Sequence, residues 1–102
     1  MTANTTVAVA VPEPERVRAH LDAVAARLGR NGWYARVTTL PGGTLALHVI
    51  NPANLAGKRL VLIEDQAQGP WFRFHHGAFI APVGEPDQAA ARIARLMAAP
   101  HC

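Results

Sequence analysis

The apolar residues of this chain recur with a helical period near each end and with a strand period in between, and this order restricts the fold class. Apolar residues spaced four, three and four apart predict a helix from Glu15 to Leu28, with a stripe of Val17, Leu21, Val24 and Leu28. Gly29 and the Asn31-Gly32 pair predict its end, because both residue types accept left-handed backbone conformations. A second stripe predicts a C-terminal helix from Pro86 to about Ala98 and consists of Ala89, Ala90, Ile93, Leu96 and Met97.

Two segments between these helices alternate like strands and are joined by a turn sequence. Trp33 to Leu40 and Thr44 to Ile50 are rich in β-branched and aromatic residues. The intervening Pro41-Gly42-Gly43 suits a three-residue hairpin loop with its last glycine in the left-handed conformation. This loop length predicts a register in which Arg36 faces His48.

Further strands are predicted downstream. Asn51 to Gly57 is expected to be a loop, and Arg59 to Glu64 contains a continuous apolar run typical of a strand buried on both faces. Asp65 to Pro70 predicts a turn, and Trp71 to His75 predicts another strand. A short extended piece, Ala78 to Ala81, follows a turn at His76-Gly77, and the sequence leaves its pairing open.

Together these elements predict an α+β two-layer sandwich. It has an N-terminal helix, an antiparallel β-meander of about four strands and a C-terminal helix, with both helices on one sheet face. The length of 102 residues and the hydrophobic content of 50% predict a single domain, at residues 13–99. Residues 1–12 are expected to form a flexible tail or, through Val7 to Val11, a short strand, and residues 100–102 a C-terminal tail.

The sheet face opposite the helices is expected to carry more large apolar groups than a monomer leaves exposed. The third strand contributes either Leu60 and Leu62 or Val61 and Ile63 to it, next to large side chains of its neighbours. A second copy of the chain, a partner protein or the Val7 to Val11 segment would cover such a face. The leading hypothesis is a small non-catalytic binding or accessory protein, a homodimer or part of a complex, whose contact residues are Tyr34, Arg36, His48, Ile50, Trp71, Arg73 and His75.

The basic residues suggest an alternative partner. Ten basic residues against seven acidic ones give a mild net charge of +3, and nine of the ten are arginine, a bias that we interpret as bacterial GC-rich coding. Arg16, Arg27 and Arg30 share one stripe of the first helix, beside the apolar one. The alternative hypothesis is therefore a nucleic-acid-associated regulatory protein that uses these three side chains.

The sequence lacks most standard catalytic constellations. The chain has no serine and a single cysteine, Cys102, so it offers neither a serine triad nor an intramolecular disulfide. It also lacks the charged start of a signal peptide, and we expect a cytoplasmic protein without membrane segment, cofactor or metal. His75 and His76 would point to opposite faces of a strand and would share a ligand only in the turn before Gly77. A small enzyme or ligand binder that uses His48, His75 or His76 ranks below the other two hypotheses.

Overall fold

A computed structural model of the chain describes residues 13–97, apart from the side chains of residues 13 and 54–57. The predicted strand at Val7 to Val11 and both predicted tails lie outside the described residues. The described elements are, in order, α1 (Glu13–Arg30), β1 (Tyr34–Thr39), β2 (Leu45–Asn51), β3 (Asn54–Gln66), β4 (Gly69–Phe74), β5 (Phe79–Pro82) and α2 (Pro86–Leu96).

The strands form one antiparallel sheet in the order β1-β2-β3-β4-β5, which confirms the α+β meander between two helices. The sheet has five strands where about four were expected, because the segment after His76 pairs with β4. His76 adopts a left-handed φ of 59°, and the Gly77 N–H donates to the Phe74 carbonyl at 2.9 Å. This tight turn reverses the chain and brings Phe79 opposite Arg73.

The β1–β2 hairpin has the predicted register. Arg36 lies opposite His48, and the Leu40 N–H donates to the Thr44 carbonyl at 2.8 Å. Gly42 and Gly43 have φ values of 95° and 91°, a conformation that residues with a side chain rarely adopt. The turn chemistry between the two strands therefore determines their pairing.

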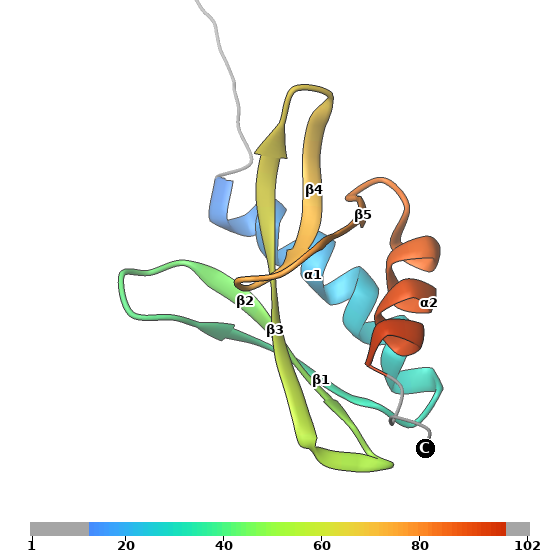
Figure 1. The fold of residues 1–102 in the computed structure, drawn as a ribbon. Coiled ribbons are helices and arrows are strands. Elements are labelled where there is room, and N and C mark those ends of the chain that lie inside the picture. The colour runs from blue at the N-terminus through green and yellow to red at the C-terminus, as the bar shows by residue number, and fades with distance from the viewer. Residues whose placement is uncertain (1–12, 98–102) are drawn as a thin grey trace, which may run out of the picture.

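β3 is longer than predicted at both ends. The expected loop at 51–57 instead contains the end of β2, the start of β3 and a tight turn, in which the Ala53 N–H donates to Asn51 Oδ1 at 2.8 Å. The expected turn at 65–70 shortens to residues 67 and 68. Consequently β2 pairs with the first part of β3 and β4 with the last part (Figure 1). The two pairings meet at Val61.

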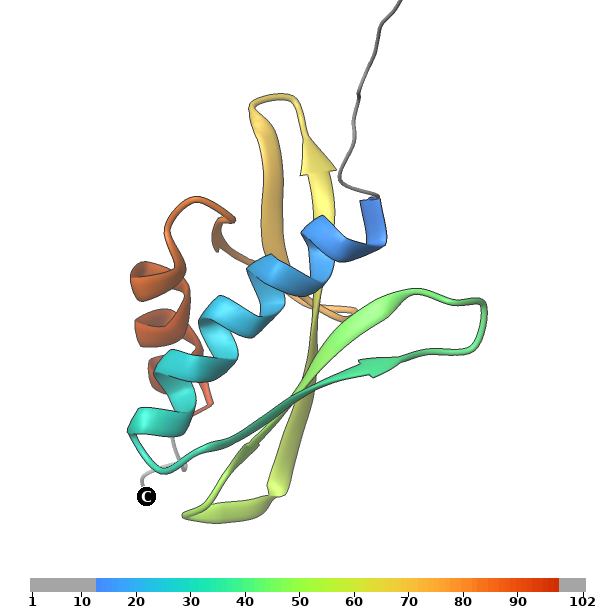
Figure 2. The ribbon, with the colours of Figure 1, turned by 180° about the vertical axis from the view of Figure 1, so that it is seen from behind.

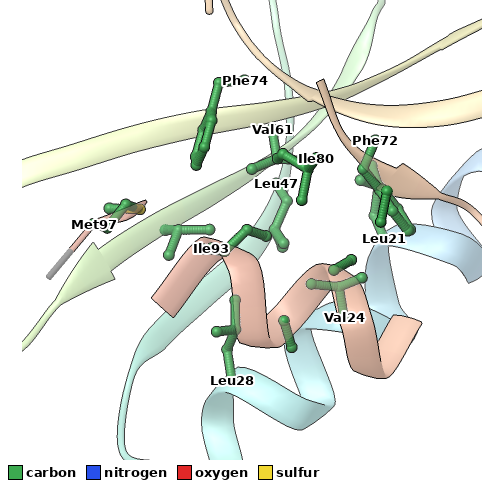
Figure 3. Close-up of a cluster of buried hydrophobic side chains, with 14 residues drawn as sticks. Leu21, Val24, Leu28, Leu47, Val61, Phe72, Phe74, Ile80, Ile93 and Met97 are labelled. Carbon is green, nitrogen blue, oxygen red and sulfur yellow. The ribbon is translucent and has the colours of Figure 1, made fainter. Parts of the chain in front are cut away.

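Both helices pack on the same face of the sheet, as predicted (Figure 1, Figure 2). The residues that join the two layers are fully buried and include Leu21, Val24 and Leu28 of α1, Ile93 of α2 and Leu47, Val61 and Phe72 of the sheet (Figure 3). This confirms the stripe predicted for the first helix. The burial of these side chains is the main source of the stability of the fold.

Two helix predictions were wrong in detail. Leu96 was assigned to the buried stripe of the second helix but is 53% exposed, because Met97, the next residue, occupies the buried position at the end of that helix. Gly29 was expected to end the first helix, yet α1 continues to Arg30. The chain turns at Gly32 instead, where φ is 83°.

Candidate functional site

The sheet face opposite the helices, called the outer face below, carries all seven residues predicted to contact a partner. Val61, Phe72 and Phe74 point into the core, so the alternating residues of β3 and β4 point outward. This places Leu60 and Leu62 on the outer face and settles which pair of the third strand lies there. No helix of residues 13–97 covers this face (Figure 1).

One end of the outer face holds a group of basic side chains around a hollow. His48, Lys58, Arg59, Leu60 and His75 line this basic hollow, which has a volume of about 430 Å³. Tyr34 packs edge-on against His48, with ring centroids 6.0 Å apart and an interplanar angle of 85°. Lys58 carries the positive charge on this face, whereas the Arg59 guanidinium lies over the Phe74 ring, 4.1 Å from its centroid. None of the residues that line it is acidic, which makes it suitable for an anionic group.

His75 and His76 come together at the end of β4. Their ring centroids are 3.8 Å apart, because β4 ends at Phe74 and His76 occupies the turn. The His75 N–H donates to the Leu60 carbonyl at 2.8 Å, which holds His75 at the rim of the basic hollow. Within residues 13–97 no group of three or more His, Cys, Asp or Glu side chains is arranged to hold a metal ion.

The other end of the outer face holds an aromatic cluster of Trp71, Phe79 and Arg73. The Trp71 and Phe79 rings meet edge to face at 6.4 Å between centroids, and the Arg73 guanidinium lies 5.1 Å from the centroid of Phe79. Arg73 also forms an ion pair with Glu64 and donates through Nε to the Gly77 carbonyl at 3.0 Å. Phe79 is 40% exposed. Sequence reasoning missed it as a site residue because it left the pairing of Ala78 to Ala81 open.

The structure does not bring Trp71 next to Tyr34 and Ile50. Ile50 lies opposite Lys58 and Trp71 lies opposite Glu64, six residues further along β3. At a rise of about 3.3 Å per residue, these positions are about 20 Å apart along the strand. The predicted contact residues therefore share a face but fall into two clusters, with Leu60 and Leu62 between them.

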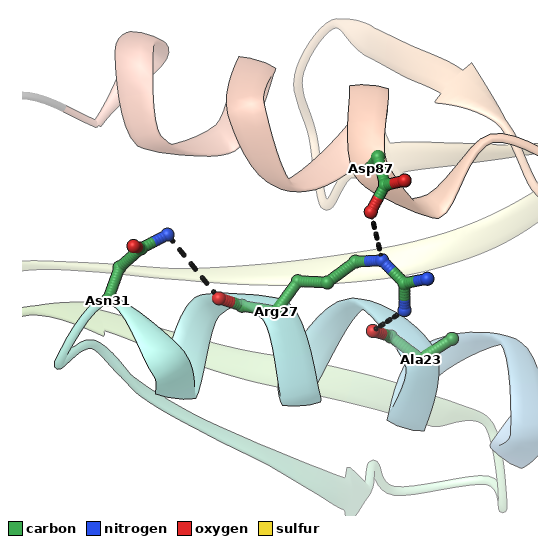
Figure 4. A network of polar contacts seen from close by, with 4 residues as sticks. All are labelled: Ala23, Arg27, Asn31 and Asp87. Carbon is green, nitrogen blue, oxygen red and sulfur yellow. Dashed lines mark hydrogen bonds and ion pairs between the residues drawn. The ribbon is translucent and has the colours of Figure 1, made fainter.

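The three arginines predicted to contact nucleic acid, Arg16, Arg27 and Arg30, lie at two separate places along α1. Arg27 forms an ion pair with Asp87 of α2 and donates through Nη1 to the Ala23 carbonyl at 2.7 Å (Figure 4). Arg30 lies near this pair and lines the same interhelical hollow, whereas Arg16 lines a different hollow with His20 and Asp65. Arg16 and Arg27 are 11 positions apart, which corresponds to about 16 Å of helix.

No helix within the described part of the chain is long and apolar enough to cross a membrane. The sequence matches no protein-family model, and neither the curated proteins nor the solved structures include a significant match to it.

Proposed function

We propose that this protein is a small non-catalytic binding or accessory protein that self-associates, or docks on a partner protein, through the outer face of its sheet. The observation that supports this proposal is a helix-free sheet face with partly exposed aromatic rings at both ends. Tyr34 is 44% exposed and Phe79 is 40% exposed. Aromatic and arginine side chains of this kind are enriched in protein interfaces.

A symmetric homodimer is the simplest form of this proposal. A two-fold axis through the outer face would bring the same surface of two chains together, and such dimers are the commonest oligomers. Size-exclusion chromatography with light scattering then gives twice the mass of the chain. A glutamate at position 71 (Trp71→Glu) places a charge in the aromatic cluster and returns the protein to a monomer.

The control for this experiment is Gln88→Glu, which adds the same charge at an exposed position of α2. This variant keeps the mass of the wild type, and the circular dichroism spectra of both variants match that of the wild type. A wild-type protein that remains monomeric at every concentration contradicts the homodimer.

The basic hollow favours a second candidate function, the binding of a small anion. His48 lies on β2 and His75 directly follows β4, and both line the same hollow with Lys58. Benzoate and inorganic phosphate are suitable probes, because the hollow offers both apolar and cationic groups. In NMR titrations, both probes should shift the His48 and His75 resonances, because these side chains line the hollow.

If the protein binds small anions in the basic hollow, Lys58→Gln weakens benzoate binding, because it removes a positive charge from the lining. His20→Gln, a histidine of α1 outside the hollow, serves as its control. Equal shifts in both variants would show that the probes bind elsewhere. The nucleic-acid alternative has less support from the geometry, because Asp87 neutralises part of the charge of Arg27.

A further inference from the structure

The sheet opens into a fork where its two halves diverge. Pairing between β2 and β3 ends at Leu47 and Val61, while β3 continues to Gln66 with β4 as its neighbour. Figure 1 shows β2 turning away from β3 beyond this crossing. In the described part of the chain, the β2 side of β3 therefore has no strand partner from Leu62 to Gln66.

The register shows which backbone groups point into this fork. Consecutive residues of a strand direct their N–H and C=O groups to opposite edges. The Leu60 carbonyl accepts from the His75 N–H on the β4 side, so the backbone groups of Leu62 and Glu64 also point to β4, whereas those of Ile63 and Asp65 point to the β2 side. Pro70, opposite Asp65, agrees with this pattern because proline has no N–H to donate. Ile63 and Asp65 thus present an open strand edge, a feature that proteins usually cover.

The start of α1 forms the floor of the fork. Pro14, Val17, Leu45 and Ile63 line one hollow of about 200 Å³. Val17 and Ile63 also line a neighbouring hollow of about 370 Å³ that reaches Asp65. Figure 2 shows the beginning of α1 in front of the opening between β2 and β3. The first hollow is mostly apolar, whereas Arg16 and His20 also line the second. An apolar hollow beside an open strand edge is the combination that accepts an extended apolar segment.

We propose that this fork is a strand-accepting site and that its occupant is Val7 to Val11 of the same chain. These residues lie outside the described part, which begins at Glu13, and Pro14 already lies in the fork. A segment that leaves Pro14 along the open edge toward Gln66 runs antiparallel to β3. Five extended residues span about 16 Å, enough to pass both Ile63 and Asp65. The alternating valines and alanines contain no proline, so every amide of the segment is free to pair.

This inference is independent of the proposed function, because the fork is separate from the basic hollow and from the aromatic cluster. Hydrogen exchange measured by NMR tests it on the Ile63 and Asp65 amides. In the full chain these amides exchange at least 10-fold more slowly than in a chain without residues 1–11, and the rates do not change with protein concentration. The Leu62 and Glu64 amides, which face β4, stay protected in both chains and report that the sheet is intact.

Two point variants keep the full length of the chain. Val9→Pro removes an amide in the middle of the segment and should lose the protection, whereas Thr5→Pro, before the segment, should keep it. Equal exchange of the Ile63 and Asp65 amides in the full and shortened chains overturns the proposal. Protection that increases with protein concentration also overturns it, because a second copy would then supply the strand.

Discussion

At the residue scale, Asn51 is the buried polar side chain that ties the β2–β3 turn to the end of α2. Its Nδ2 donates to the Met97 carbonyl at 2.9 Å, and its Oδ1 accepts from the Ala53 N–H at 2.8 Å. Asn51→Ala leaves both backbone partners without a bond and should lower the free energy of unfolding by about 1–3 kcal/mol. Asn31→Ala, at an exposed position, should change it by about 0.5 kcal/mol or less. Urea denaturation of both variants measures the difference, and equal losses would contradict the structural role of Asn51.

Residue identity also explains which turns were predictable. The glycines between β1 and β2 need their positive φ values, so the hairpin loop could be read from the sequence. His76 has a positive φ without being glycine, a choice that local propensity does not favour. Gly77 still made a turn predictable here, and local bonds such as that from the Gly77 N–H to the Phe74 carbonyl close it. The pairing of β5 with β4 could not be read from the sequence, because the segment is only four residues long.

At the element scale, two residues of α2 that were predicted to share its buried stripe, Ile93 and Leu96, differ in exposure. Ile93 is fully buried, whereas Leu96 is 53% exposed. Ile93→Ala should lower the free energy of unfolding by about 2–5 kcal/mol, because it leaves a cavity between the helices and the sheet. Leu96→Ala should change it by about 0.5 kcal/mol or less. Chemical denaturation distinguishes the two, and a large loss for Leu96→Ala would return that residue to the core.

The same scale shows what helical periodicity left out about the basic stripe of α1. Helical periodicity placed Arg27 beside Arg30, but it contains no information about a neighbouring helix. Asp87 lies in the first turn of α2, 60 residues after Arg27 in the sequence. The packing of α1 against α2 brings the two side chains together. A long-range ion pair of this kind depends on the tertiary arrangement.

At the scale of the whole molecule, the proposed homodimer links association to stability. Self-association stabilises the folded state by mass action, so the melting temperature of the wild type should rise with protein concentration. Trp71→Glu should melt at a temperature independent of concentration. Differential scanning calorimetry over a 100-fold range of about 5–500 μM measures both proteins. A constant melting temperature for the wild type would contradict the homodimer.

The sequence by itself determined the order of the elements up to β4 and the C-terminal helix, the buried stripe of α1, the register of the first hairpin and the shared face of the seven residues predicted to contact a partner. These features depend on residue spacing and turn chemistry over a few positions. Only the tertiary structure decided how far each partner extends along β3, and with it the separation of Trp71 from Tyr34 and the fork beside Ile63. The physical reason is that strand pairing continues only while two twisted hairpins stay in contact, and their packing against α1 and α2 sets where they diverge.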